Sequence, residues 1–199
     1  MKQTIVSKNY STLLTKNRKQ IMYDYGFYKG PMNTIQDEAY WNAVLKVNQT
    51  YLPKNYHVKN YYEATDIVLR NLRAFTRSGC TNFKLSEFKC NCQGKYCSGY
   101  PEVLKQNLLR NLQSLRDYYN TAITITCGLR CQKYNDSLPG SIKHSKHTMG
   151  KAADIYVSQK SDTEDGRKQI INKWMTLPAA SYAYQGTTNM GNATHVDIK

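Results

Sequence analysis

Residues 145–154 read Ser-Lys-His-Thr-Met-Gly-Lys-Ala-Ala-Asp, a polar loop that runs into the beginning of an apolar strand. His147 lies in the loop, Gly150 permits a tight turn, and Asp154 emerges on the strand predicted for residues 152–157. A turn of this length can bring the His147 imidazole and the Asp154 carboxylate onto one metal ion. The other interpretation of the same residues is a solvated histidine and a carboxylate that caps a turn.

A second polar pair lies near the end of the chain, in Thr194-His195-Val196-Asp197-Ile198, which predicts a strand. His195 and Asp197 share one face of that strand, because residues two apart in a strand point the same way. Two histidines and one carboxylate leave the fourth position of a zinc ion open for water, which is typical of catalytic zinc. Zinc held in this way acts as a Lewis acid and lowers the pKa of its water towards about 7.

The segments around these two stretches predict an α+β domain with a mainly antiparallel sheet. Leucines at near-helical spacing follow Pro101 and predict a helix over 101–119, and alternation predicts a strand over 122–127. An acidic start followed by apolar positions predicts a second helix over 161–176. With the strands at 152–157 and 194–198, these elements form the proposed second domain, residues 81–199.

The N-terminal part, residues 1–76, predicts a small module of three helices. Asp37 and Glu38 suit the beginning of the second helix, because acidic side chains stabilise a helix N-terminus. The small and polar segment 76–82 predicts a linker to the second domain. A module of this size has a thin core and is more suited to binding than to catalysis. The expected helix stripes are Leu13, Leu14, Asn17 and Ile21; Trp41, Val44, Leu45 and Asn48; and Thr65, Val68, Leu69 and Leu72.

The chain of 199 residues carries 28 Lys and Arg against 14 Asp and Glu, a formal net charge of +14. This charge predicts anionic partners, and it is divided evenly between the two parts. The sequence has no basic tail and no nucleic-acid motif, so specific nucleic-acid binding is not expected. It also lacks a signal-peptide core and any apolar run of about 20 residues. We therefore expect a protein without a membrane span that is synthesised in the cytoplasm. We also expect it to be a monomer.

Six cysteines leave three interpretations open. They occur as Cys90-x-Cys92-x4-Cys97, as Cys127-x3-Cys131, and as Cys80 in the predicted linker. An even number permits disulfides formed after release from the cytoplasm, whereas synthesis in a reducing compartment favours thiols at first. A structural metal bound by cysteines is the third possibility, although the spacing matches no strong zinc signature.

The pattern His147-x-x-Gly150-x-Ala152-x-Asp154, followed by His195-x-Asp197, resembles the family of zinc D-alanyl-D-alanine carboxypeptidases and L-alanyl-D-glutamate endopeptidases, distantly related to the hedgehog signalling domain. The resemblance covers about residues 81–199. Its further matches are Phe83-Lys84-Leu85-Ser86-Glu87-Phe88 for "FxxxEF", Cys127-Gly128-Leu129-Arg130 for "SGYR", Asn135, Gly140, and Ser145-Lys146-His147 for "SxH".

The resemblance implies zinc ligands at His147, Asp154 and His195. It also implies substrate-binding residues at Arg130, Asn135 and Ser145. The Arg130 guanidinium would hold a substrate carboxylate or amide oxygen, or it would pair structurally with an acidic neighbour such as Asp136. His144 would either stabilise the transition state or lie exposed in its loop.

The general base is the position at which this sequence departs from the family. Many members carry an acidic residue three positions before the last histidine, where this chain has Asn192. An amide cannot take a proton from water, so Asp197 is our substitute for the base. Asp197 would alternatively orient His195 as a hydrogen-bond partner.

The N-terminal part resembles the three-helix peptidoglycan-binding module over residues 8–75, through the turn 25–31 and the segments 41–44 and 62–65. The second glycine of the module's turn is missing, and an unrelated helical bundle is the alternative. The two resemblances together imply a two-part enzyme that holds bacterial peptidoglycan and cleaves a stem-peptide bond, either D-Ala-D-Ala or L-Ala-D-Glu.

A wall hydrolase without a signal peptide resembles a bacteriophage endolysin, which acts on the cell wall after its release from the host cytoplasm. An autolysin exported by another route is the alternative within the same class. Anionic wall polymers would then be the partners of the positive charge. The competing class is a zinc-containing protein that binds the wall or has a structural role without catalysis, for which Asn192 is the main argument.

Overall fold

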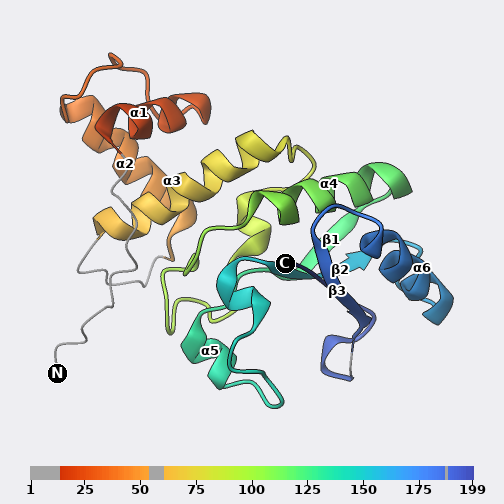
Figure 1. Ribbon diagram of the computed structural model, residues 1–199. Helices are drawn as coiled ribbons and strands as arrows, with labels where there is room; N and C mark the ends of the chain where they lie inside the picture. The colour runs from red at the N-terminus through yellow and green to blue at the C-terminus, as the bar shows by residue number, and fades with distance from the viewer. Residues whose placement is uncertain (1–13, 54–60, 187) are drawn as a thin grey trace.

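The computed structural model describes residues 14–53, 61–186 and 188–199, and it confirms the α+β fold class. Three helices precede a four-stranded antiparallel sheet that is combined with further helices (Figure 1). One continuous hydrophobic core extends from Ile21 to Ile198. Within the described ranges, no helix has both the length and the apolar character that a membrane span requires.

The first helix, α1 (Thr15–Asp24), buries a face that differs from the predicted one. Leu14 and Asn17 are exposed, and Leu13 lies outside the described residues. Arg18 and Lys19 are buried instead, together with Ile21 and Met22. Of the predicted stripe, the burial of Ile21 is confirmed, whereas the burial of Leu14 and Asn17 is wrong. A charged side chain can be buried when a partner is available, and a hydrophobic pattern does not reveal such partners.

The buried cations of α1 bind groups from other elements. Arg18 Nη2 lies 2.8 Å from Asp66 Oδ1, and Lys19 Nζ donates to Asn33 Oδ1 over 2.7 Å. Arg18 also stacks on the Tyr62 ring at 3.7 Å from its centroid. These contacts attach α1 to the third helix and to the turn before the second.

The second and third helices agree better with the sequence. In α2 (Glu38–Tyr51), the side chain of Asp37 caps the N-terminus by accepting from the Tyr40 amide over 2.8 Å, as predicted. Val44 and Asn48 are buried as expected. The other two stripe residues of α2, Trp41 and Leu45, are exposed. In α3 (Tyr61–Ser78), all four predicted positions are buried, as a hydrophobic stripe requires.

The connection between the two parts is shorter than the predicted linker. Helix α3 continues through Ser78, so residues 76–78 are helical and that portion of the linker prediction is wrong. Cys80 and Phe83 are buried, and the rings of Phe75 and Phe88 pack edge to face with centroids 5.7 Å apart. Because this segment is mostly small and polar, its sequence did not predict that Cys80 and Phe83 would be buried. The division into functional domains at 1–76 and 81–199 stays a prediction.

The second part contains the predicted strands and one further strand. Helix α4 begins at Gln106 rather than at Pro101, and α6 begins after Thr163, whose side chain caps it. The strand at 180–185 has no predicted counterpart. In order, the elements are η1 (Leu85–Phe88), α4 (Gln106–Tyr119), β1 (Ile123–Cys127), α5 (Gln132–Asp136), η2 (Lys146–Met149), β2 (Ala152–Val157), α6 (Glu164–Met175), β3 (Ala180–Gln185), η3 (Thr188–Met190) and β4 (Thr194–Ile198).

The sheet has the order β1-β2-β4-β3, and each neighbouring pair is antiparallel. Helices α4 and α6 lie beside it (Figure 1) and contribute Leu108 and Trp174 to the core that contains Ile155 and Val196. The Trp174 indole donates to the Asp197 carbonyl oxygen over 3.0 Å, which attaches α6 to β4. Because strand residues alternate between faces, the residues next to Ile155 and Val196 point to the other face.

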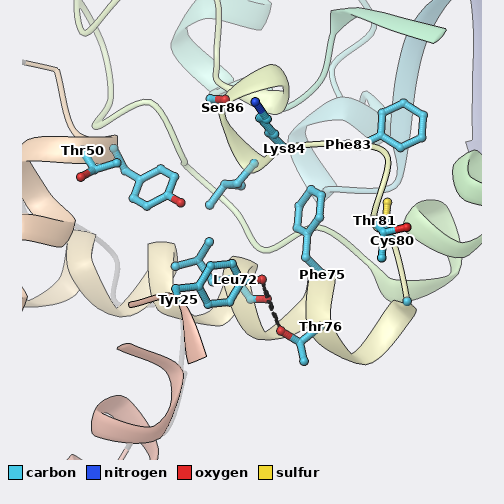
Figure 2. Close-up of a pocket in the computed structure, with 13 residues that line it drawn as sticks. Tyr25, Thr50, Leu72, Phe75, Thr76, Cys80, Thr81, Phe83, Lys84 and Ser86 are labelled. Atoms are coloured by element: carbon cyan, nitrogen blue, oxygen red, sulfur yellow. Dashed lines mark hydrogen bonds between the residues drawn. The ribbon is translucent and has the colours of Figure 1, made fainter. Parts of the chain in front are cut away.

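A cavity of about 810 Å³ lies where the helical part meets segment 79–86 (Figure 2). Tyr25, Leu72, Phe75 and Phe83 are among the residues that line it, and Tyr25 Oη donates to the Leu72 carbonyl oxygen over 2.7 Å. The lining includes none of the predicted metal ligands. The cavity therefore belongs to the joint between the two parts and not to the candidate site.

Candidate functional site

Four chemically active side chains form a row across the sheet. Asp154 of β2 pairs directly with His195 of β4, Cys127 of β1 pairs with Asp154, and Tyr184 of β3 pairs with His195. Directly paired residues of antiparallel strands present their side chains on the same face. The row therefore lies on the face opposite to Ile155 and Val196, and one side chain comes from each of the four strands.

His147 reaches this row from the 3₁₀-helix η2. Gly150 ends that helix in the left-handed conformation, with φ 66°, and an added Cβ there would collide with the Val103 carbonyl. The His147 ring is oriented by the Gly128 carbonyl oxygen, 2.8 Å from Nδ1, and Arg130 N donates to the His147 carbonyl oxygen over 3.2 Å. The predicted turn thus exists, and the backbone of residues 128–130 fixes the imidazole in place.

The three predicted ligands converge through one atom each. His147 Nε2 lies 3.2 Å from His195 Nδ1 and 3.2 Å from Asp154 Oδ1, and His195 Nδ1 lies 2.8 Å from Asp154 Oδ1. All three residues are buried, with exposed fractions of 3%, 7% and 5% for His147, His195 and Asp154. Two imidazole nitrogens and one carboxylate oxygen therefore point at one common position.

This donor set fits a zinc ion. Two ring nitrogens 3.2 Å apart cannot both present lone pairs to each other, so without a cation at least one of them carries a proton. Burial by itself would lower the pKa of His147, but the hydrogen bond to Asp154 and the nearby Cys127 raise it to about 10. Burial would raise the pKa of Asp154, but its hydrogen bonds to His147 and His195 hold it below its usual value. The residues therefore form a pocket that favours a positive charge, which a zinc ion would supply.

Arg130 lies at the edge of this centre. Its Nη2 is 3.8 Å from Asp154 Oδ2 and donates to Cys127 Sγ over 3.3 Å, while Nη1 donates to Asn135 Oδ1 over 3.3 Å. Among the described residues, the ion pair of Arg130 is with Asp154 and not with Asp136, whose carboxylate accepts from Gln132 over 2.6 Å. The structural pairing that we considered for Arg130 therefore involves a predicted metal ligand rather than Asp136.

The remaining predicted residues lie in different surroundings. Asn135 is fully buried, and its side chain both accepts from Arg130 and donates to the Ile142 carbonyl oxygen over 2.9 Å. Ser145 is buried at the beginning of η2. His144 is exposed and takes no part in the hydrogen bonds that join the three candidate ligands. Asn192, at the position of the family's acidic residue, is exposed.

Asp197 meets His195 on the side of the ring remote from the other ligands. Asp197 Oδ2 lies 3.4 Å from His195 Nε2, whereas His195 Nδ1 faces Asp154. Asp197 Oδ1 is buried without a hydrogen-bond partner among the described residues. The geometry therefore suits the orienting role of Asp197 better than the role of general base.

Three further groups at this centre had no predicted role: the side chains of Cys127 and Tyr184 and the Gly128 carbonyl. Cys127 Sγ lies 3.9 Å from His147 Nδ1, and the Tyr184 ring stacks on His195 with centroids 4.7 Å apart. Burial would raise the pKa of the Cys127 thiol, but His147 and Arg130 lower it. Cys127 occupies the serine position of the "SGYR" pattern, and this position was the only indication in the sequence that Cys127 lies at the centre. Tyr184 gave no signal because its strand was not predicted.

A family model described as Peptidase M15 matches residues 81–197, which is more than half of the chain. The chain is a member of the peptidase M15 family. Comparisons with curated proteins and with solved structures find no match. The matched range of this M15 peptidase contains all three convergent residues, and peptidases of this family depend on zinc. The family assignment therefore agrees with the chemistry of the donor set.

Proposed function

We propose that this M15 peptidase is a zinc-dependent peptidoglycan peptidase that cleaves a stem-peptide bond of the D-Ala-D-Ala or L-Ala-D-Glu type. The observation that carries this proposal is the convergence of His147 Nε2, Asp154 Oδ1 and His195 Nδ1 within 3.2 Å of one another. A set of two imidazole nitrogens and one carboxylate oxygen leaves the fourth position of a tetrahedral site for water or substrate.

The chain's own residues would divide the work around a zinc ion held by these three atoms. When bound, such an ion polarises a carbonyl and activates water for hydrolysis. The Arg130 guanidinium, whose side chain is 15% exposed, presents a charged fork of donors beside the ligands and would hold a substrate carboxylate or amide oxygen. The Gly128 carbonyl and Asp197 would keep the two imidazoles in their ligating orientations.

The helical part would hold the cell wall while the peptidase part cleaves it. Its resemblance to a peptidoglycan-binding module and the net charge of +14 support this division. We propose that the whole protein acts as a bacteriophage endolysin. Teichoic acids and related wall polymers are the anionic partners that this charge would attract.

The decisive experiment measures new amino groups released from purified peptidoglycan. The wild-type chain loaded with zinc should release them, and His147→Ala should not, because it removes one of the three ligands. Met175→Ala is the control, since Met175 is exposed at the end of α6, outside the group of ligands. Mass spectrometry of the released muropeptides identifies the bond that is cut.

The opposite result would favour the non-catalytic class of protein. The argument for that class is that Asn192 stands where many family members carry an acidic residue. If wild-type protein binds zinc and sediments with cell walls but releases no amino groups, the peptidase proposal fails and a wall-binding role replaces it. The endolysin role has a separate test. Bacteria that express the chain should remain intact until their membrane is permeabilised with chloroform, and lysis before that treatment would contradict it.

A further inference from the structure

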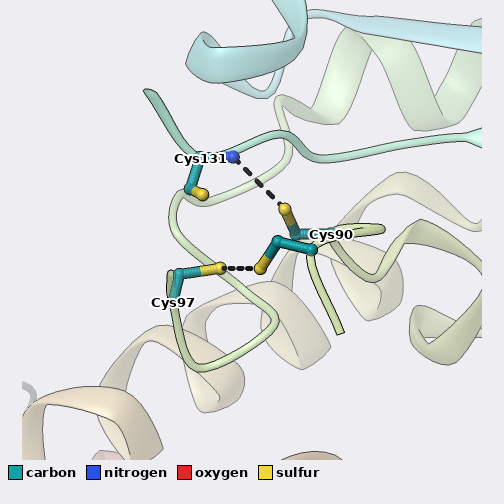
Figure 3. Close-up of side chains that lie close together, drawn as sticks. Cys90, Cys97 and Cys131 are labelled. Atoms are coloured by element: carbon teal, nitrogen blue, oxygen red, sulfur yellow. Dashed lines mark hydrogen bonds between the residues drawn. The ribbon is translucent and has the colours of Figure 1, made fainter. Parts of the chain in front are cut away.

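A second group of metal-binding side chains lies apart from the candidate active site. Cys90, Cys92, Cys97 and Cys131 are all buried, and their sulfur atoms lie within 4.8 Å of one another. Figure 3 shows Cys131 facing Cys90 and Cys97 across a loop. Three of the thiols come from one short loop and the fourth from the beginning of α5. None of the six cysteines forms a disulfide in the structure.

The spacing of the sulfur atoms suits one small tetrahedral ion. Zinc binds cysteine sulfur at about 2.3 Å, which places the four sulfurs of a tetrahedron about 3.8 Å apart. Cys92 Sγ and Cys97 Sγ are separated by 3.4 Å, and the group as a whole stays within 4.8 Å. A compact group of four is what a single ion requires, whereas two disulfides would require only two separate pairs.

Backbone amides point at these sulfurs. Gly99 N donates to Cys97 Sγ over 3.4 Å, and Cys131 N donates to Cys90 Sγ over 3.3 Å. Donors directed at sulfur stabilise the negatively charged thiolate, which is the form that binds metal. Two of the four sulfurs, Cys97 Sγ and Cys90 Sγ, thus accept backbone hydrogen bonds that favour their thiolate form.

The loop has little else to hold it together. Residues 89–99 contain no helix or strand, and Gln93, Gly94 and Gly99 have positive φ values. The partly buried apolar side chains packed on the four cysteines are only Tyr96 and Tyr134 among the described residues. A segment with so small an apolar core usually needs a covalent or metal cross-link.

We propose that Cys90, Cys92, Cys97 and Cys131 bind a structural zinc ion, separate from the zinc of the active site. Four thiolates fill a tetrahedral site and leave no position for water, so this ion has no catalytic role. The ion would instead act on the enzyme by fixing the position of Cys131 and of the turn that precedes it. Cys131 directly follows Arg130, and the same turn carries the Gly128 carbonyl that orients His147.

The test is the metal content of the purified full-length protein, prepared under reducing conditions and measured by mass spectrometry of the elements. We expect two zinc ions per chain in the wild type, one in His147→Ala and one in Cys97→Ser. Cys80→Ser should keep both, because Cys80 is a buried thiol outside the group. After replacement of the remaining ion by cobalt, His147→Ala should show the intense near-ultraviolet absorption of sulfur bound to cobalt.

The His147→Ala variant keeps the proposal testable even if Cys97→Ser does not fold, since His147→Ala leaves all four thiols in place. A His147→Ala protein without zinc would overturn the proposal, as would an intact mass that shows two disulfides in wild-type protein purified without reductant. Iron in place of zinc would also overturn it, because iron is the other metal that four thiolates commonly bind. These readouts do not depend on peptidase activity, so they distinguish failure here from failure of the proposed function.

Discussion

His195 is held between two carboxylates, one on each ring nitrogen. Asp154 faces Nδ1 at 2.8 Å and Asp197 faces Nε2 at 3.4 Å. A carboxylate on the nitrogen remote from a metal fixes the tautomer and orientation of the ring and increases its basicity. The contact of Asp197 with Nε2, and not with the side of the ring that faces Asp154, supports this role, because a general base has to reach the water that it deprotonates.

Replacement of Asp197 tests this distinction. Asp197→Asn should reduce zinc affinity about 10- to 100-fold, because the amide no longer stabilises the ligating form of His195. Competition with a chelator measures the change, and Asp162→Asn, which alters an exposed partner of Tyr156, is the control. Unchanged zinc affinity together with lost turnover would instead identify Asp197 as the base.

Gly128 is the second residue at which a small change should affect the site. A Cβ at this position would lie 2.5 Å from Phe88 Cα, so Gly128→Ala should displace the carbonyl that orients His147. We expect a loss of about 1–3 kcal/mol in the free energy of unfolding and weaker zinc binding. Met175→Ala is the control, because Met175 is exposed at the end of α6, outside the group of ligands. Equal zinc affinity in the two variants would contradict the orienting role of the Gly128 carbonyl.

At the scale of elements, helix α3 joins the helical part to the peptidase part. Its Asn71 side chain is fully buried, donates to the Glu102 carbonyl oxygen over 3.1 Å and accepts from the Leu104 amide over 2.9 Å. Leu72 and Phe75 of the same helix belong to the core that the peptidase part shares. Wall binding is therefore best tested in the full chain, because excision at residue 79 would expose these side chains.

Asn71→Ala measures how strongly the two parts are coupled. The variant loses three side-chain hydrogen bonds, of which two are to Glu102 and Leu104 beyond α3, so the free energy of unfolding should decrease by about 1–3 kcal/mol. Urea unfolding monitored by circular dichroism provides the value. The matched control, Asn107→Ala on the exposed side of α4, should change it by less than about 0.5 kcal/mol. If Asn71→Ala leaves the unfolding curve unchanged, the two parts are not coupled through this contact.

At the scale of the whole molecule, positive charge is present in both parts. The net charge of +14 would favour capture of an anionic wall from any approach, and such attraction is screened by salt. The Debye length is about 8 Å at physiological ionic strength and about 3 Å at 1 M. Electrostatic capture and cleavage at the zinc site should therefore respond differently to salt.

The fraction of protein that sediments with purified cell walls should fall as salt is raised from about 0.15 M to about 1 M. Walls stripped of teichoic acids should bind less protein at low salt and show a weaker dependence on salt. Sedimentation that is independent of salt on both kinds of wall would mean that charge does not control capture.

Much of the fold and of the candidate site could be predicted because the relevant signals are local. The loop at 145–154 and the strand at 194–198 carry their own patterns, and the strand period of two places His195 and Asp197 on one face. The strand β3 was missed because most of its residues are only partly buried, so it lacks a clear alternation. The buried stripe of α1 was missed because Arg18 and Lys19 are stabilised by partners from distant segments.

By itself, the sequence determined the α+β class and the main strands, because these depend on the order of neighbouring residues, and its resemblance to a known family implied the three candidate zinc ligands. Only the tertiary structure decided which ring nitrogen of each histidine faces the common position. It also placed Asp197 behind His195 and brought Cys131 to the three cysteines of the 89–99 loop. The physical reason is that such contacts join segments far apart in the chain, and pairing and packing in three dimensions determine which segments meet.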